Sequence, residues 1–291
     1  ITFHGLNLIV QINKTLQKKL DPYSYQTFID KRNLKYSWYI MPSSDIIIKN
    51  ISNVPEIQSN DNLSKIIIHA LKKNRLKLKN KDVLVITQKI ISKSENRLVH
   101  KNNIIPTQSA KKLSKQIGKS SVLTQLILDE SQRIIKKKHG VIITETNHGF
   151  ICANSGIDQS NIPPNYFCLL PINPDKSAKK IRIALEREFN VKLGVIISDT
   201  FGRPFRSGQI DVAIGVSGIS PLLNYKGKKD SFKKNINVTS IAIADELASS
   251  AELVLGKTNK SPIALIRGYD FQISSKNSKL LIMPKNKSMF S

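Results

Sequence analysis

The 291-residue sequence is poor in cysteine and in aromatic side chains, and it has no long apolar run. Its two cysteines, Cys152 and Cys168, are too few for a disulfide framework and lack zinc-ligand spacing, which is typical of a protein from a reducing compartment. No stretch reaches the ~20 consecutive apolar residues of a membrane-spanning helix. We therefore expect a cytoplasmic protein without a membrane partner.

Acidic residues are also scarce, because 46 Lys and Arg face only 21 Asp and Glu, for a formal net charge of +25. Such an excess is typical of proteins that bind nucleic acid or an anionic ligand. Here the lysines are dispersed, and Lys, Asn and Ile are enriched together, as an AT-rich genome would produce. Genome composition is therefore the favoured explanation and an anionic small molecule the second, and specific nucleic-acid binding is not expected.

Apolar residues make up 40% of the chain, which is enough for a sizeable core. The apolar pattern is clear from residue 45 onward, so we interpret residues 1–44 as an N-terminal extension of unknown role and residues 45–285 as the folded domain. Strands are expected at residues 46–48, 82–87, 141–144, 149–153, 167–170, 195–197, 211–216, 236–244 and 262–267. Helices are expected at residues 61–72, 109–117, 121–134, 177–189 and 245–255, so the fold class is α/β.

The stretch from residue 193 to residue 206 concentrates polar chemistry after an apolar strand. Residues 195–197 are apolar, Asp199 and Thr200 follow, and a Gly-Arg-Pro turn brings Arg203 and then Arg206. Chemistry in open α/β sheets lies at the carboxyl ends of strands. Asp suits a hard cation and Arg suits phosphate oxygens, so the stretch predicts a site for a metal-bound phosphate. The alternative is that Asp199 caps a turn and the arginines are solvated.

Two further segments follow expected strands. Residues 154–161 contain a glycine turn, Asp158 and Asn161. Residues 87–93 contain Lys89 and Lys93, which could hold phosphates as point charges. Taken alone, the first segment is equally typical of an ordinary turn and the second of a solvated face.

Eight strings together resemble the coenzyme F420:L-glutamate ligase family in order and approximate spacing. They cover residues 83–95, 148–149, 152–161, 170–171, 198–206, 213–218, 244–248 and 255–257. The resemblance extends over about residues 50–270 and leaves residues 1–44 outside it. It implies mixed sheets flanked by helices in an intertwined homodimer, with residues 45–285 as the catalytic domain.

The resemblance also implies a reaction. Family members join L-glutamate to the lactyl carboxylate of the deazaflavin cofactor precursor and convert GTP to GDP and phosphate. An acyl phosphate is the expected intermediate, since a carboxylate is a poor electrophile until it is phosphorylated. A divalent metal, Mg²⁺ or Mn²⁺, is implied, and K⁺ is a further candidate ion.

Residue by residue, Asp158 and Asp199 match metal ligands and Thr200 matches a second metal contact. Asp158, Asp199 and Arg203 are the catalytic candidates, and the two carboxylates are expected to converge on one ion, with Thr200 facing the same cleft. The expected nucleotide contacts are Val54, Pro55, Glu56, Ile57, Gln88, Lys89, Lys93, Asn161, Gly256 and Lys257.

Lys257 departs from the family pattern, in which the resemblance leads us to expect an acidic ligand for a second metal ion. An ammonium group cannot ligate a cation. Either the second ion is lost, or Glu252 or Asp245 supplies the ligand, or the lysine replaces the charge of the ion.

Two other functions stay open. The chain could be a ligase-like enzyme with one metal that acts on a different carboxylate and amine, or a non-catalytic member of the fold that binds RNA or an anionic ligand. The retained Asp158, Asp199 and Thr200 argue against the binding protein, whereas Lys257 and the high charge favour it. Whether the organism makes the deazaflavin coenzyme would discriminate between them.

Overall fold

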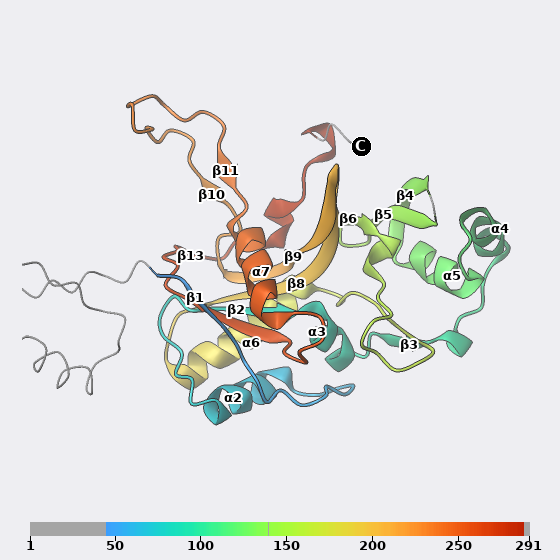
Figure 1. The fold of residues 1–291 in the computed structure, drawn as a ribbon, viewed down its shortest axis with the longest axis horizontal. Coiled ribbons are helices and arrows are strands. Elements are labelled where there is room, and N and C mark those ends of the chain that lie inside the picture. The colour runs from blue at the N-terminus through green and yellow to red at the C-terminus, as the bar shows by residue number, and fades with distance from the viewer. Residues whose placement is uncertain (1–44, 139, 288–291) are drawn as a thin grey trace, which may run out of the picture. The chain divides into compact units, whose positions relative to one another are not determined.

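A computed structural model describes residues 45–138 and 140–287 (Figure 1). Contacts divide the chain into two units, Ile1–Asp45 and Ile46–Ser291, and the fold below is that of the second. The expected extension at residues 1–44 lies outside the described residues. In the described part of the chain, no helix combines the length and the apolar character needed to cross a membrane.

The described unit is a mixed α/β structure, as predicted. Its helices are α2 Leu63–Lys73, α3 Gln88–Ser94, α4 Gln108–Ile117, α5 Ser121–Asp129, α6 Pro174–Phe189 and α7 Ile243–Leu255. Its strands are β1 Ile47–Asn50, β2 Val83–Thr87, β3 Leu98–His100, β4 Ser131–Lys138, β5 Val141–Thr146, β6 Ile151–Ala153, β7 Tyr166–Cys168, β8 Gly194–Arg203, β9 Arg206–Ile219, β10 Leu223–Asn224, β11 Ser240–Ile241, β12 Ile263–Arg267 and β13 Ile273–Ser274.

A six-stranded sheet in the order β1-β12-β2-β8-β9-β13 forms the centre. Only β2 and β8 run parallel, and they pair from Val83 opposite Gly194 to Thr87 opposite Ser198. Helices α2 and α6 cover one face of this sheet and α7 covers the other. Because both faces are covered, β2 is a continuous apolar run, which explains why it could be predicted from the sequence.

Helices α6 and α7 contact the part of β9 that does not pair with β13. A Cβ atom on Gly215 would lie 2.6 Å from the carbonyl carbon of Pro174, so glycine lets the start of α6 pack directly against the strand. Asp245 of α7 accepts a hydrogen bond from the amide of Ala213, and Ser249 donates to the carbonyl of Asp211. These bonds occupy backbone groups that a bare sheet edge would leave unpaired.

Two expected elements were wrong in part. The expected helix at 121–134 ends at Asp129, and the following residues form β4 because β5 offers a hydrogen-bonding partner. The expected strand at 236–244 is reduced to Ser240–Ile241, which pairs with β10. Helix α7 already begins at Ile243, since its apolar stripe packs on the central sheet.

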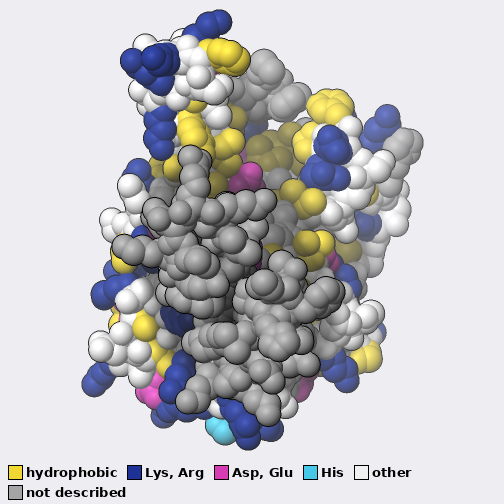
Figure 2. Space-filling model, turned by 60° about the vertical axis from the view of Figure 1, so that its left-hand side comes forward, with side chains coloured by type: hydrophobic (Ala, Val, Ile, Leu, Met, Phe, Trp, Pro, Cys, Tyr) yellow, Lys and Arg dark blue, Asp and Glu magenta, His cyan; other side chains and the backbone are white. Residues whose placement is uncertain are grey.

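The basic charge is distributed rather than gathered. Figure 2 shows Lys and Arg side chains around the described border of one face, with no single continuous basic area among them. The connection between β10 and β11, which projects from the sheet in Figure 1, contains five lysines. This distribution agrees with the dispersed charge in the sequence.

Candidate functional site

The site lies where β2 and β8 stop running side by side. Their last pair is Thr87 opposite Ser198, after which α3 begins at once and β8 continues as a hairpin with β9 as far as Arg203. The strand expected at 195–197 is therefore longer than predicted, because β9 pairs with β8 as far as Arg203, four residues past Asp199. Asp199 nevertheless lies one residue past the parallel pair, at its carboxyl edge.

Backbone pairing brings Asp158 to this edge. Its amide donates to the carbonyl of Cys168 at 3.0 Å and its carbonyl accepts from the Cys168 amide at 2.8 Å. The preceding Gly156 has φ +70°, and a Cβ atom there would lie 2.8 Å from the side chain of Leu170. This tight turn, which only glycine fits, directs the Asp158 loop toward α3.

The carboxylate of Asp158 is held by cationic and neutral donors. Lys89 Nζ lies 2.7 Å from its Oδ2, and Ser160 donates through its amide to Oδ1 at 2.7 Å and through its hydroxyl to Oδ2 at 3.0 Å. Burial raises the pKa of Asp158, but Lys89 and Ser160 together outweigh burial and the net pKa is lowered. Asp158 is therefore ionised at neutral pH.

The pKa of Asp199 is shifted in the opposite direction to that of Asp158. Its pKa is raised to about 7, mainly by burial and further by the negative charges of Asp158 and Asp211, against the opposing effects of the Thr200 amide and Lys89. The structure thus brings Asp158 and Asp199, the two expected metal ligands, within electrostatic reach of each other. Carboxylates close enough to disfavour each other's ionisation are a common feature of functional sites.

Thr200 points to the other face of β8, because neighbouring side chains of a strand alternate. Its hydroxyl donates to Asp211 Oδ1 at 2.7 Å, and Ser198, on the same face, donates to Asp211 Oδ2 at 3.1 Å. Asp211 is only 3% exposed. The expectation that Thr200 would face the same cleft as Asp199 was therefore wrong.

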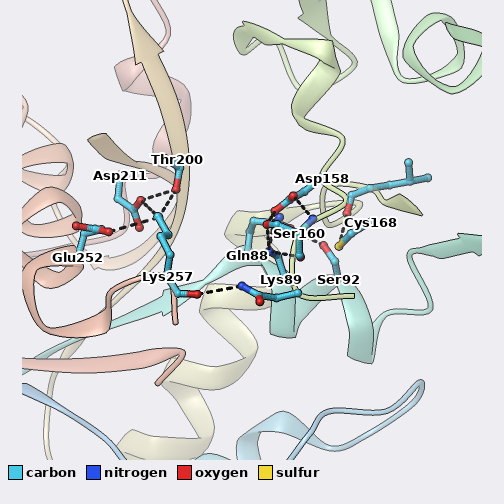
Figure 3. A network of polar contacts seen from close by, with 12 residues as sticks. Gln88, Lys89, Ser92, Asp158, Ser160, Cys168, Thr200, Asp211, Glu252 and Lys257 are labelled. Atoms are coloured by element: carbon cyan, nitrogen blue, oxygen red, sulfur yellow. Dashed lines mark hydrogen bonds and ion pairs between the residues drawn. The ribbon is translucent and has the colours of Figure 1, made fainter. Parts of the chain in front are cut away.

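Lys257 comes from the loop after α7 and meets this group. Its Nζ donates to Thr200 Oγ1 at 2.7 Å and to Asp211 Oδ1 at 3.2 Å, and lies 3.6 Å from Glu252 Oε1. Its carbonyl oxygen accepts a hydrogen bond from Asn161 Nδ2 at 3.1 Å. This last bond ties the loop of Lys257 to the loop that carries Asp158, and Figure 3 shows the Lys257 group beside the group around Asp158 and Lys89.

Two of the expected nucleotide segments also meet. The ammonium of Lys93, whose side chain is 8% exposed, is paired with the carboxylate of Glu56, which is 71% exposed. Gln88 is buried and accepts from the hydroxyl of Ser92 at 2.8 Å. In the segment at 54–57, Ile57 is a core residue and Val54 packs against the core, whereas Pro55 and Glu56 are exposed. The exposed pair is therefore the part of this segment that a ligand can reach.

Arg203 lies in the β8–β9 turn. Its guanidinium donates to the carbonyls of Ser207 and Gly208 in the same hairpin, at 2.7 and 3.5 Å. These bonds hold it in the turn rather than on the acidic residues. The neighbouring Arg206 is exposed.

Sequence reasoning missed Asp211 and Ser160. A hairpin register would have placed Asp211 opposite Thr200, but β8 and β9 pair with two irregularities, near Ser198 and Arg203, that the sequence does not reveal. Ser160, two residues after Asp158, follows the local side chain to backbone pattern of an Asx turn and could have been found.

The residues fit a divalent ion only in part. Across residues 45–138 and 140–287, no group of three or more His, Cys, Asp and Glu side chains could hold a metal alone. Mg²⁺ is commonly bound by one or two carboxylates together with substrate phosphates and water. Asp158 and Asp199 match that donor set, and a cation would offset the burial and the repulsion that raise the pKa of Asp199.

The two cysteines near the site are not nucleophiles. Burial, assisted by the charge of Asp199, raises the pKa of Cys152 to about 12, and burial raises that of Cys168 to about 11. Both thiols stay protonated at neutral pH, and thiol catalysis needs the thiolate.

A cavity of about 450 Å³ adjoins the β8–β9 hairpin. Its walls include Phe150, Ile151, Phe201 and Val212, and Val212 pairs with Asp199 across the hairpin. The ring centroids of Phe150 and Phe201 are 6.4 Å apart in an edge-to-face arrangement. A cavity of this size and apolar character can take a small molecule.

The sequence is similar to known proteins over the whole of this site. A profile of the family described as F420-0:Gamma-glutamyl ligase matches residues 52–268. The coenzyme F420:L-glutamate ligase of Methanococcus maripaludis (strain S2) is 45% identical over 218 residues, which cover 73% of this chain and 86% of that protein. The ligase of the same name from Methanocaldococcus jannaschii is 46% identical over 210 residues, covering 72% and 84%. The one from Methanothermobacter thermautotrophicus is 38% identical over 248 residues, covering 84% and 98%.

Proposed function

This chain belongs to the F420-0:gamma-glutamyl ligase family, and from that membership we propose that it joins L-glutamate to the carboxylate of the coenzyme F420 precursor, with GTP as the energy source. The observation that carries the proposal is the meeting of Asp158 and Asp199 with Lys89 at the carboxyl edge of the parallel strand pair. Acids for a cation beside a lysine are what phosphoryl transfer requires.

The reaction needs an activated carboxylate. A carboxylate oxygen of the precursor attacks the γ-phosphorus of GTP, the bond to the bridging oxygen breaks, and GDP leaves with its electron pair. The glutamate amine then attacks the acyl carbon, phosphate leaves, and the amine loses a proton. The protein contributes mainly positioning and neutralisation of charge.

The chain offers residues for both tasks. Asp158 and Asp199 would hold Mg²⁺ or Mn²⁺, which supplies positive charge for the phosphate oxygens when bound. Lys89 and Lys93 are point charges at the ends of flexible stems. A nucleotide phosphate would compete with Glu56 for Lys93, since Glu56 is mostly exposed. The apolar cavity beside Phe201 suits the ring of the precursor.

The test is a product assay with the purified full chain. Precursor, L-glutamate, GTP and Mg²⁺ are mixed, and products are followed by mass spectrometry and nucleotide chromatography. We expect one GDP for each glutamyl residue added, little reaction with ATP, and no reaction after chelation of the metal. GTP consumption that does not depend on the precursor would contradict the proposed substrate.

A second candidate is a ligase with one metal that acts on another carboxylate and amine, since a lysine at position 257 replaces the expected ligand of a second ion. The same assay with other carboxylic acids and amines in place of the precursor and glutamate separates the two, because GDP release that depends on such a pair would identify the second candidate.

We also propose a homodimer. Light scattering should give twice the chain mass of 32.7 kDa, and a value of one chain mass would contradict it.

A further inference from the structure

The side chain of Lys257 occupies the centre of a set of oxygen atoms. Its ammonium contacts the hydroxyl of Thr200, the carboxylate of Asp211 and, at 3.6 Å, the carboxylate of Glu252. Thr200 donates its own proton to Asp211, so the lone pairs of its oxygen are available to the ammonium. A hydroxyl and two carboxylates are also the donors that a hard divalent cation takes.

Asp211 needs this positive charge. It is 3% exposed, and its neutral partners, Ser198 and Thr200, supply hydrogen bonds but no charge. A buried carboxylate that loses its cationic partner is strongly destabilising. Lys257 is the charge partner that the structure places on Asp211.

The loop around Lys257 fixes the direction of its side chain. Its carbonyl accepts from Asn161, so the backbone is tied to the Asp158 loop while the ammonium is tied to the β8–β9 hairpin. The preceding Gly256 has φ +58°, and a Cβ atom there would lie 2.8 Å from Asn259 Nδ2. Figure 3 shows the lysine side chain extended between the two groups.

We propose that Lys257 is the resident cation of the cluster formed by Thr200, Asp211 and Glu252, so that the α7 side of the site takes no divalent metal. The ammonium occupies the position that an ion would need, and a lysine cannot serve as a metal ligand while protonated. Resting on the proposed function, this means that the ligase works with one divalent ion, at Asp158 and Asp199, and one fixed ammonium.

The test counts Mn²⁺ ions bound by the full-length protein, using calorimetry and the electron paramagnetic resonance signal of free Mn²⁺. The variants are Lys257→Glu, Lys257→Gln and the control Lys192→Glu. Lys192 is a matched control because it is 64% exposed and pairs with the mostly buried Glu186, whereas Lys257 is 58% exposed and pairs with Asp211. Thermal unfolding verifies that each variant is folded.

We expect Lys257→Glu to bind one more equivalent of Mn²⁺ than the wild type, and Lys192→Glu to bind the same number as the wild type. Lys257→Gln, which removes the charge without adding a carboxylate, should bind the added ion at least tenfold more weakly than Lys257→Glu. Adding Asp211→Asn to Lys257→Glu should remove the extra equivalent, which locates it at this cluster.

Equal counts in Lys257→Glu and the wild type would overturn the inference, and so would an extra equivalent in Lys192→Glu. A wild type that already binds two ions would overturn it as well. A wild type that binds none, with one ion gained in Lys257→Glu, would contradict the metal in the proposed function and still support the role of Lys257.

Discussion

A carboxylate lies at each end of the parallel pair β2–β8, and a cationic partner neutralises only one of the two. At the amino end, Asp82 is 1% exposed and accepts from Arg267 Nε at 2.8 Å, Arg267 Nη2 at 2.6 Å and the Lys79 amide at 2.7 Å. At the carboxyl end, the pKa of Asp199 rises to about 7 through burial and then through the charges of Asp158 and Asp211.

The two carboxylates differ in whether a cationic side chain neutralises them. Asp82 stabilises the fold, whereas Asp199 is available to bind a ligand. Asp82 has a bidentate guanidinium partner, the strongest kind of ion pair that side chains form. Lys89 also lowers the pKa of Asp199, but its direct ion pair is with Asp158. The same sheet therefore neutralises its acid at one end and leaves an excess of acid at the other, where we propose the metal and nucleotide bind.

The largest effect should come from Asp199→Asn. The change keeps the shape and removes the charge, so ligase turnover should fall by on the order of 10³-fold, the scale for one lost group that stabilises transition-state charge. Steady-state GDP release measures it, with circular dichroism to verify the fold. An unchanged rate would remove Asp199 from the site.

Asp82→Asn tests the carboxylate at the amino end of the strand pair, and it should lower stability without lowering activity. It leaves the partly buried Arg267 facing a neutral amide, and breaking a buried pair costs about 3–5 kcal/mol. Urea unfolding should show a lower midpoint. The folded fraction should keep its rate of GDP release, and a rate that falls as far as in Asp199→Asn would mean that the two ends do not have separate roles.

The dependence of stability on pH should distinguish Asp199 as well. A carboxyl whose pKa is higher in the folded than in the unfolded protein favours folding when protonated, and that contribution is lost as pH rises from about 4 to about 7. Without divalent metal, Asp199→Asn should therefore equal the wild type at pH 4 and exceed it by about 1–3 kcal/mol at pH 8. Urea titrations at both values measure this, and a variant less stable than the wild type at pH 8 would contradict it.

The smallest effect concerns the positive charge elsewhere on the chain. The lysines are dispersed along the chain, so nucleic acid should bind weakly and lose affinity steeply with salt. Fluorescence anisotropy with a labelled RNA at several salt concentrations measures it. A sequence-selective complex that survives physiological salt would show that the charge forms a specific surface.

Sequence patterns predicted the parts of this fold that are set by local rules. Asn62 caps α2, the helix expected at 61–72, through a hydrogen bond from the Lys65 amide, and asparagine is among the residues that favour this position. The strands expected at 141–144 and 149–153 are present as β5 and β6, which pair as a hairpin because turn residues separate the two apolar runs.

The remaining features of the fold and the site depend on contacts between residues that are distant in the sequence. Residues 131–138 could continue a helix, and they became a strand only because β5 lies beside them. Asp158 and Asp199 could be proposed from local motifs and family resemblance, but their opposite pKa shifts depend on Lys89 and on burial in the fold. The contact of Lys257 with Asp211 joins a loop to a strand 46 residues earlier, across a register that contains irregularities.

The most direct test of the central claim is calorimetry of GTP binding at pH 8, with and without Mg²⁺, for the wild type and Asp199→Asn. If the acid pair receives a metal together with the nucleotide, the wild type should bind GTP at least tenfold more tightly with Mg²⁺, and Asp199→Asn should lose most of that gain. Equal Mg²⁺ dependence in the two proteins, or no GTP binding by the wild type with Mg²⁺ present, would contradict the account.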